Sequence, residues 1–124
     1  MNKKILLVED EASIADVFKD QLTLGGFEVD IASGGAQALE KLKTNDYGMM
    51  LLDLVMPEVD GLAVLQAIKE KPDEYHNVPI IALTNVTSDD IRKEIEAYNV
   101  KGYLQKLSVK PQELLETVNN TITK

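Results

Sequence analysis

Several side chains that could carry chemistry stand at or just past the ends of short, mainly apolar segments. Glu9 and Asp10 follow the first segment, and Asp53 closes a run that is otherwise wholly apolar. Thr84 and Lys106 close two later segments. Carboxylate oxygens suit Mg²⁺ and Mn²⁺, and a carboxylate can accept a transferred group covalently. A cation and a lysine together would relieve the negative charge that develops on a phosphoryl group, so the set predicts phosphoryl transfer if it converges.

Asp53 is the most informative of these residues. It follows Met49–Leu52, a run with no other polar side chain. Crowded carboxylates raise one another's pKa and destabilise a fold unless a cation neutralises them. An acid at this place, close to Glu9 and Asp10, therefore indicates a cation site.

Taken singly, these residues have ordinary structural explanations. Thr84 could cap a turn and Lys106 could be a solvated loop lysine. Glu11 and Glu58 are typical of solvated loops after strands. His76, the single histidine, lies in a polar loop and is best explained as solvated. The argument for a functional site rests on the constellation, because several strand ends carry matching groups.

The elements that must position these side chains alternate between strands and helices. Apolar runs predict strands at Ile5–Val8, Phe27–Ala32, Met49–Leu54, Val78–Leu83 and Gly102–Gln105. Apolar residues at three- and four-residue spacing predict helices carrying Ile14, Val17, Phe18 and Leu22; Ala38, Leu39 and Leu42; Leu62, Leu65 and Ile68; Ile91, Ile95 and Tyr98; and Leu114, Leu115, Val118 and Ile122. Thr87 and Asp90 have the spacing of a capping box, and Asn99 suits the left-handed conformation at a helix end.

This alternation predicts an α/β fold with a doubly wound parallel sheet covered on both faces. In such sheets, ligands bind beyond the carboxyl ends of the strands, at the topological switch point. The acids, the hydroxyl and the amine stand at those ends, so we expect them to meet at one edge of the sheet.

Length and composition restrict the class of protein. The chain has 124 residues, no cysteine and a formal net charge of −8. The acidic balance argues against binding of nucleic acid or an anionic membrane, and the lack of cysteine excludes disulfides and Cys-based zinc sites. No apolar run approaches the ~20 residues of a membrane span. We expect residues 1–124 to form one domain in the cytoplasm.

The motifs resemble those of a known family. The stretch Leu52–Gly61 contains Asp-x-x-Met-Pro-x-x-Asp-Gly, with Glu9-Asp10 upstream and Thr84 and Gly102–Lys106 downstream. This pattern resembles the receiver domain of two-component response regulators, the CheY-like superfamily, over essentially the whole chain. The resemblance implies a flavodoxin-like three-layer sandwich with a five-stranded parallel sheet in the order 2-1-3-4-5.

The resemblance also implies a metal-dependent acceptor site. Asp53 would accept a phosphoryl group from a phosphohistidine on a sensor histidine kinase or a phosphotransfer protein. Asp10, Asp53 and the backbone carbonyl of Val55 would ligate Mg²⁺, with Mn²⁺ as a substitute, and Glu9 would hold the metal through water.

Further implied roles concern switching. Lys106 would pair with the phosphoryl oxygens, and Thr84 would donate a hydrogen bond to the phosphoryl group. Tyr103 would be the aromatic switch that follows Thr84 and reshapes the face of the fourth helix, fifth strand and fifth helix. The domain would catalyse only its own phosphorylation and dephosphorylation, and a phosphorylation-dependent dimer is compatible with this scheme. Its output partner stays unidentified.

Some positions depart from the family pattern. Leu107 follows Lys106, where the family often has a proline in a cis peptide. Lys110 precedes Pro111 at a position that favours Asn, Asp, Ser or Thr as a helix cap. These departures concern the loop after Lys106 and leave every predicted catalytic group in place.

Two other functions fit this sequence less well than the switch. An aspartyl phosphatase generally needs a second acid two residues after its nucleophile, and that position is Val55. A flavin-binding electron carrier would need a Ser/Thr-rich phosphate loop after the first strand, where Glu9–Glu11 would repel the phosphate.

Overall fold

A computed structural model describes residues 2–56, 59–85 and 89–122 of the chain. Its helices and strands alternate in the order β1 Lys4–Val8, α1 Ala12–Leu24, β2 Glu28–Ala32, α2 Gly35–Thr44, β3 Met49–Asp53, α3 Gly61–Glu70, the 3₁₀ helix η1 Pro72–Tyr75, β4 Ile80–Thr84, α4 Asp89–Glu96, β5 Val100–Gln105 and α5 Pro111–Thr121. The five strands are parallel and lie in the order β2-β1-β3-β4-β5, as predicted.

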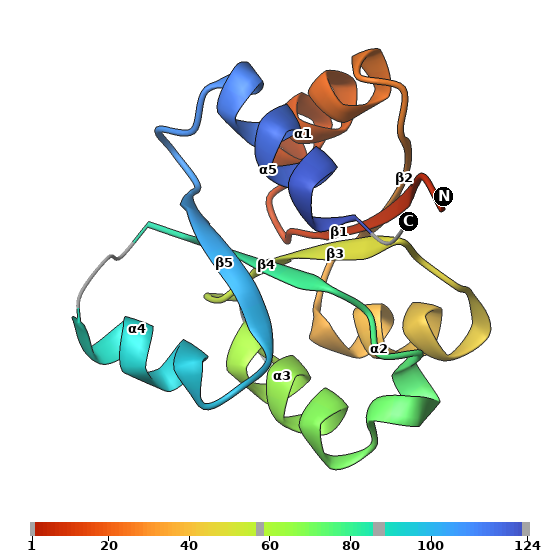
Figure 1. The fold of residues 1–124 in the computed structure, drawn as a ribbon, viewed down its shortest axis with the longest axis vertical. Coiled ribbons are helices and arrows are strands. Elements are labelled where there is room, and N and C mark those ends of the chain that lie inside the picture. Colours follow the sequence, from red (N-terminus) through yellow and green to blue (C-terminus); the bar gives the residue numbers. More distant parts are fainter. Residues whose placement is uncertain (1, 57–58, 86–88, 123–124) are drawn as a thin grey trace.

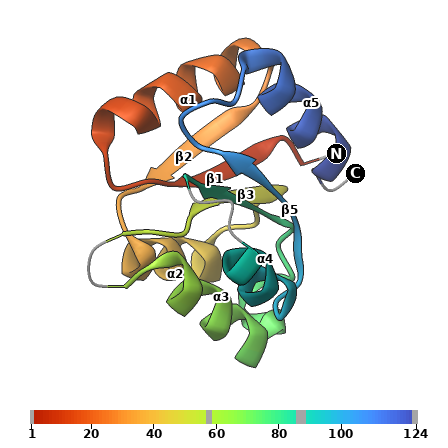
Figure 2. The ribbon, with the colours of Figure 1, turned by 90° about the vertical axis from the view of Figure 1, so that its left-hand side faces the viewer.

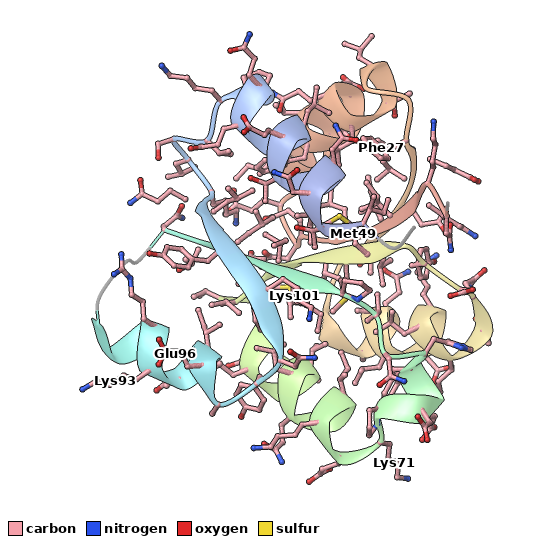
Figure 3. All side chains as sticks on the ribbon, in the orientation of Figure 1. Phe27, Met49, Lys71, Lys93, Glu96 and Lys101 are labelled. Atoms are coloured by element: carbon pink, nitrogen blue, oxygen red, sulfur yellow. The ribbon has the colours of Figure 1, made fainter. Side chains whose placement is uncertain are left out.

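Helices cover both faces of this sheet. Figures 1 and 2 show α1 and α5 on one face and α2, α3 and α4 on the other. Each face has its own apolar core, and Figure 3 shows Phe27 and Met49 in the layer beneath α1 and α5. The chain is therefore a three-layer α/β sandwich.

The central strands are buried along nearly their whole length, which accounts for their apolar sequences. Every residue of β3 and β4 is buried, and so are the last residues of β1. A parallel strand that is buried on both faces reads as a continuous apolar run. The exceptions, Asp53 and Thr84, stand at the carboxyl ends of β3 and β4.

Strand boundaries differ from the predictions by one residue in β1, β2 and β3, and by up to two residues in β4 and β5. β4 begins at Ile80 because Pro79 has no N–H to donate to the ladder, although its carbonyl accepts a hydrogen bond from Met50. β5 begins at Val100, before the predicted Gly102. The register shifts there, since Ile80 and Ile81 pair with Val100 and Gly102 and leave Lys101 between them.

Three helical predictions were wrong in detail. Tyr98, predicted on the fourth helix, lies beyond the end of α4 at Glu96. Val17 is 54% exposed, and Ala15 lies buried on the inner face of α1 in its place, with Phe18 and Leu22. Asn99 is not left-handed, whereas His76 and Asn77 are, with φ of 61° and 50° at the end of η1. The predicted cap Thr87 lies outside the described residues. In the described ranges, no helix has the length and apolarity to cross a membrane.

Candidate functional site

The carboxyl ends of four strands lie abreast at one edge of the sheet. Register pairs Val8 with Leu52 and Asp53 with Leu83, while β5 extends beside β4 as far as Gln105. The residues that close or follow these strands therefore come together from distant parts of the chain. As predicted from their positions, Glu9, Asp10, Asp53 and Lys106 meet at this edge. Thr84 closes the neighbouring strand β4.

Lys106 joins two of the acids directly. Its Nζ donates a hydrogen bond to Asp53 Oδ2 at 3.0 Å and to Glu9 Oε1 at 2.9 Å. Glu9 Oε2 lies 2.8 Å from the same Nζ. All three side chains are almost fully buried. One ammonium group therefore balances part of the negative charge of this edge.

Burial and pairing act on the ionisation of these groups. Burial raises the pKa of Glu9, aided by the charge of Asp53, and hydrogen bonds from Lys106 and the Glu11 N–H oppose the rise. Burial alone would lower the pKa of Lys106, but its hydrogen bonds to Glu9 and Asp53 outweigh burial and raise it. Lys106 is therefore held in the charged form that a phosphoryl group would need beside it.

Three carboxylates form a cluster that fits a small divalent cation. Glu9, Asp10 and Asp53 each offer an oxygen, and these oxygens lie within 4.8 Å of one another. Asp10 is open to solvent, whereas Glu9 and Asp53 are buried. Hard oxygen donors with access to water match Mg²⁺, which binds through one or two carboxylates and keeps several waters. The residues present thus fit the cation that the acidic pattern predicts.

The backbone after β3 folds back over the acceptor candidate. The Val55 N–H donates to Asp53 Oδ1 at 3.1 Å, and the Gly61 N–H donates to the Leu54 carbonyl. A methyl group at Gly61 would lie 2.5 Å from the Asp53 carbonyl oxygen, so only glycine allows this approach. Asp60 caps α3 by accepting a hydrogen bond from the Ala63 N–H. The role of the Val55 carbonyl as a metal ligand stays a prediction.

The loop after Lys106 forms a compact turn without the family's proline. The Lys106 N–H donates to the Thr84 carbonyl at 3.0 Å, which fixes the lysine next to β4. The Gln105 carbonyl accepts hydrogen bonds from the N–H groups of Ser108 and Val109. Leu107 projects outward and is 74% exposed. This turn positions Lys106 by backbone hydrogen bonds.

Thr84 and Tyr103, the predicted switch pair, occupy different surroundings. Thr84 is buried at the end of β4, one residue after Leu83, which pairs with Asp53. Tyr103 pairs with Ala82 in the middle of β5, half-buried and outside the acid cluster. Their switching roles stay predictions. The lysine bridge between Glu9 and Asp53 was not foreseen, because no spacing along the chain signals which acid a distant lysine contacts.

Known proteins share both the sequence pattern and this fold. The response regulator receiver domain family matches residues 5–119. The regulatory protein LuxO of Vibrio cholerae is 35% identical over 121 residues, which cover 95% of this chain and 25% of LuxO. The alkaline phosphatase synthesis transcriptional regulatory protein PhoP of Bacillus subtilis is 37% identical over 84 residues, 68% of this chain and 34% of PhoP.

Solved structures of receiver domains have the same fold as this chain. Chemotaxis protein CheY4 of Vibrio cholerae has a TM-score of 0.89 and 30% identity, covering 98% of this chain and 100% of that one. A CheY-like receiver domain of Methanospirillum hungatei has a TM-score of 0.85 and 28% identity, covering 97% of this chain and 93% of that one. The chain spans about a quarter to a third of the length of the two regulators named above. It belongs to the response regulator receiver domains of two-component signalling.

Proposed function

We propose that residues 1–124 form a single receiver domain that acts in the cytoplasm as a phosphorylation-operated switch. Asp53 accepts a phosphoryl group from a phosphohistidine on a sensor histidine kinase or phosphotransfer protein. The observation that carries this proposal is the meeting of Asp53 with Lys106 and two further acids, Glu9 and Asp10, at one edge of the sheet.

The transfer needs an accessible acceptor oxygen and a route for the leaving group. An Asp53 carboxylate oxygen bonds to phosphorus while the nitrogen–phosphorus bond of the phosphohistidine breaks. The bonding electron pair returns to the imidazole nitrogen of the partner, and Asp53 becomes an acyl phosphate. A divalent cation held by Asp10, Asp53, the Val55 carbonyl and, through water, Glu9 would supply positive charge beside the phosphoryl oxygens.

Lys106 changes partners in this proposal. In the present structure its ammonium contacts Glu9 and Asp53. On phosphorylation it pairs with the phosphoryl oxygens, where its positive charge stabilises the added negative charge. Thr84 donates a hydrogen bond to the same group, and Tyr103 follows, which reshapes the face formed by α4, β5 and α5.

An apolar groove beside Lys106 supports a protein as phosphoryl donor. It has a volume of about 370 Å³ and lies between α1 and the loop after β5. Val17 and Leu107, both exposed, line it with Ile14. A small phosphate donor would have no use for this surface, whereas a partner helix could bury its apolar side chains there.

The switch proposal includes no turnover of an external substrate. The domain catalyses only its own phosphorylation and dephosphorylation, and its output is a changed surface for a partner protein or a second copy of the domain. The acidic net charge supports a domain that does not itself bind nucleic acid or a membrane.

The test is covalent labelling with acetyl phosphate and Mg²⁺, followed by mass spectrometry. The wild type should gain one phosphoryl group that is labile in base, and labelling should require Mg²⁺. Asp53→Asn should abolish it, because an amide is not an acceptor. Asp46→Asn, at an exposed aspartate before β3, is the matched control and should label normally. Normal labelling of Asp53→Asn would refute the assignment.

The same preparation distinguishes the alternative functions. Sustained release of phosphate from small phosphomonoesters would support the aspartyl phosphatase, and a bound yellow chromophore would support the flavin carrier. The geometry favours neither, since exposed Val55 stands where the phosphatase needs an acid and Glu9 and Asp10 stand where the flavin phosphate would lie.

A further inference from the structure

The ring of Tyr103 carries a cation on its face. The guanidinium carbon of Arg92 lies 5.2 Å from the ring centroid, within the range of a cation–π interaction. Arg92 belongs to α4 and is exposed, and Tyr103 belongs to β5 and is half-buried. This contact therefore joins the helix and the strand of the face that the proposed function would reshape.

Apart from partial packing against the apolar core on one face of the sheet, little else fixes the position of this ring. Tyr103 borders a hollow of about 290 Å³ on the α4 side and another of about 640 Å³ on the α5 side. Within the described ranges, its hydroxyl has no hydrogen-bond partner. Tyr98 differs, because Lys69 lies over its ring at 5.4 Å and its hydroxyl donates to Gln66 Oε1. Tyr103 thus depends on Arg92 more than Tyr98 depends on Lys69.

Arg92 is suited to this task. In the part of the chain that the structure describes, it makes no ion pair with a carboxylate. A planar guanidinium stacks on aromatic faces better than a compact ammonium does. Its neighbour Lys93 points away from the sheet into solvent (Figure 3), so it does not take part in the contact.

We infer that Arg92 is a positioning residue that holds the Tyr103 ring in the conformation seen here and opposes its movement on activation. The inference rests on the proposed function, in which Tyr103 moves after phosphorylation of Asp53. A contact present in one state and broken in the other shifts the equilibrium by its own free energy. At a partly exposed site, a cation–π contact corresponds to about a two- to fivefold bias.

The experiment follows the tyrosine rings by fluorine NMR in chain labelled with fluorotyrosine. The chain has four tyrosines, and Tyr103→Phe assigns the relevant signal. Beryllofluoride, which mimics a phosphoryl group, is titrated at saturating Mg²⁺. Arg92→Gln should lower the beryllofluoride concentration at half-change of the Tyr103 signal by about two- to fivefold. Arg92→Lys, which keeps the charge but loses the planar stacking surface, should restore only part of the wild-type value.

Lys69→Gln is the matched control, because it removes a cation from the other half-buried tyrosine. It should move the Tyr98 signal and leave the beryllofluoride midpoint unchanged. An Arg92→Gln midpoint equal to wild type, or a Lys69→Gln midpoint shifted as far as that of Arg92→Gln, would overturn the role of Arg92. A wild type that responds around Asp53 but not at Tyr103 would overturn it as well. Absence of any response, together with absence of acetyl phosphate labelling, would overturn the proposed function too.

Discussion

At the residue scale, Lys106 makes it possible to bury two carboxylates side by side. Glu9 follows β1 and Asp53 ends β3, and each contacts the same ammonium group. Without that group, two buried acids would face each other with Asp10 close by. The pairing means that a residue assigned to phosphoryl chemistry also stabilises the resting fold.

Replacing Lys106 tests this double role. Lys106→Met should lower the free energy of unfolding without Mg²⁺ by about 3–5 kcal/mol, because it leaves buried carboxylates uncompensated. Added Mg²⁺ should restore more stability to this variant than to the wild type, since the cation replaces the missing charge. Urea denaturation with and without Mg²⁺ measures both effects.

Lys110→Met is the control for the Lys106 variant. It removes one positive charge from an exposed lysine of the same loop, so it should change stability by no more than about 0.5 kcal/mol. Equal stabilities of the two variants would show that Lys106 does not compensate the acids.

At the element scale, the start of α3 contacts the residues that directly follow Asp53 at the end of β3. Asp60 satisfies the Ala63 N–H, and the next residue, Gly61, donates back to Leu54. Asp60→Ala should lower the free energy of unfolding by about 1 kcal/mol, because the Ala63 N–H at the start of the helix loses its acceptor. Asp60→Asn should lose much less, since its side-chain oxygen can still accept the bond. Thermal unfolding of the two variants checks this, and equal losses would contradict the cap.

The elements also show what the sequence could and could not predict. Strands buried on both faces, such as β3, could be recognised from apolar runs alone. The start of β5 was missed because β5 pairs only with β4, so a polar Lys101 is tolerated inside it. On α1, spacing favoured Val17, but the small Ala15 is the residue that faces the sheet.

In the candidate site, too, some contacts could be predicted from the sequence and others could not. The meeting of Glu9, Asp10, Asp53 and Lys106 could be predicted, because parallel strands present their carboxyl ends at one edge. The contact between Arg92 and Tyr103 could not, because it depends on how α4 lies against β5 and on side-chain conformation. Sequence spacing predicts which strand end or helix face a residue occupies, but not which partner a long side chain reaches.

At the scale of the whole molecule, a second polar network ties three segments together at the end of the sheet opposite the acids. Asp30 on β2 accepts a hydrogen bond from the Tyr47 hydroxyl at 2.8 Å and lies 3.5 Å from Lys4 Nζ on β1. Burial raises the pKa of Asp30, but these partners outweigh it and lower the pKa below its ordinary value of 3.8. Because its pKa is lowered in the folded state, Asp30 makes the stability of the fold depend on pH in acid.

The sign of the pH dependence follows from that lowered pKa. The stability that Asp30 contributes is fully present above pH 3.8 and is lost as the pH falls through the lower folded-state pKa. Asp30→Asn should therefore be less stable than wild type at neutral pH, and the gap should close in acid because protonated Asp30 resembles Asn. Tyr47→Phe should show the same trend. Urea denaturation from neutral pH into acid measures the difference in stability between each variant and the wild type. A difference that stays constant into strong acid would contradict the pairing.

The order of the strands has a consequence for a chain emerging from the ribosome. β1 pairs first with β2, β3 then joins the other side of β1, and β4 and β5 follow in turn. From β4 onward, each new strand covers the edge that the previous strand left open. The most hazardous interval lies between β4 and β5, because all five residues of β4 are buried in the finished sheet. A nascent chain stalled in that interval would leave this apolar strand at an open edge of the sheet, where other nascent chains can pair with it.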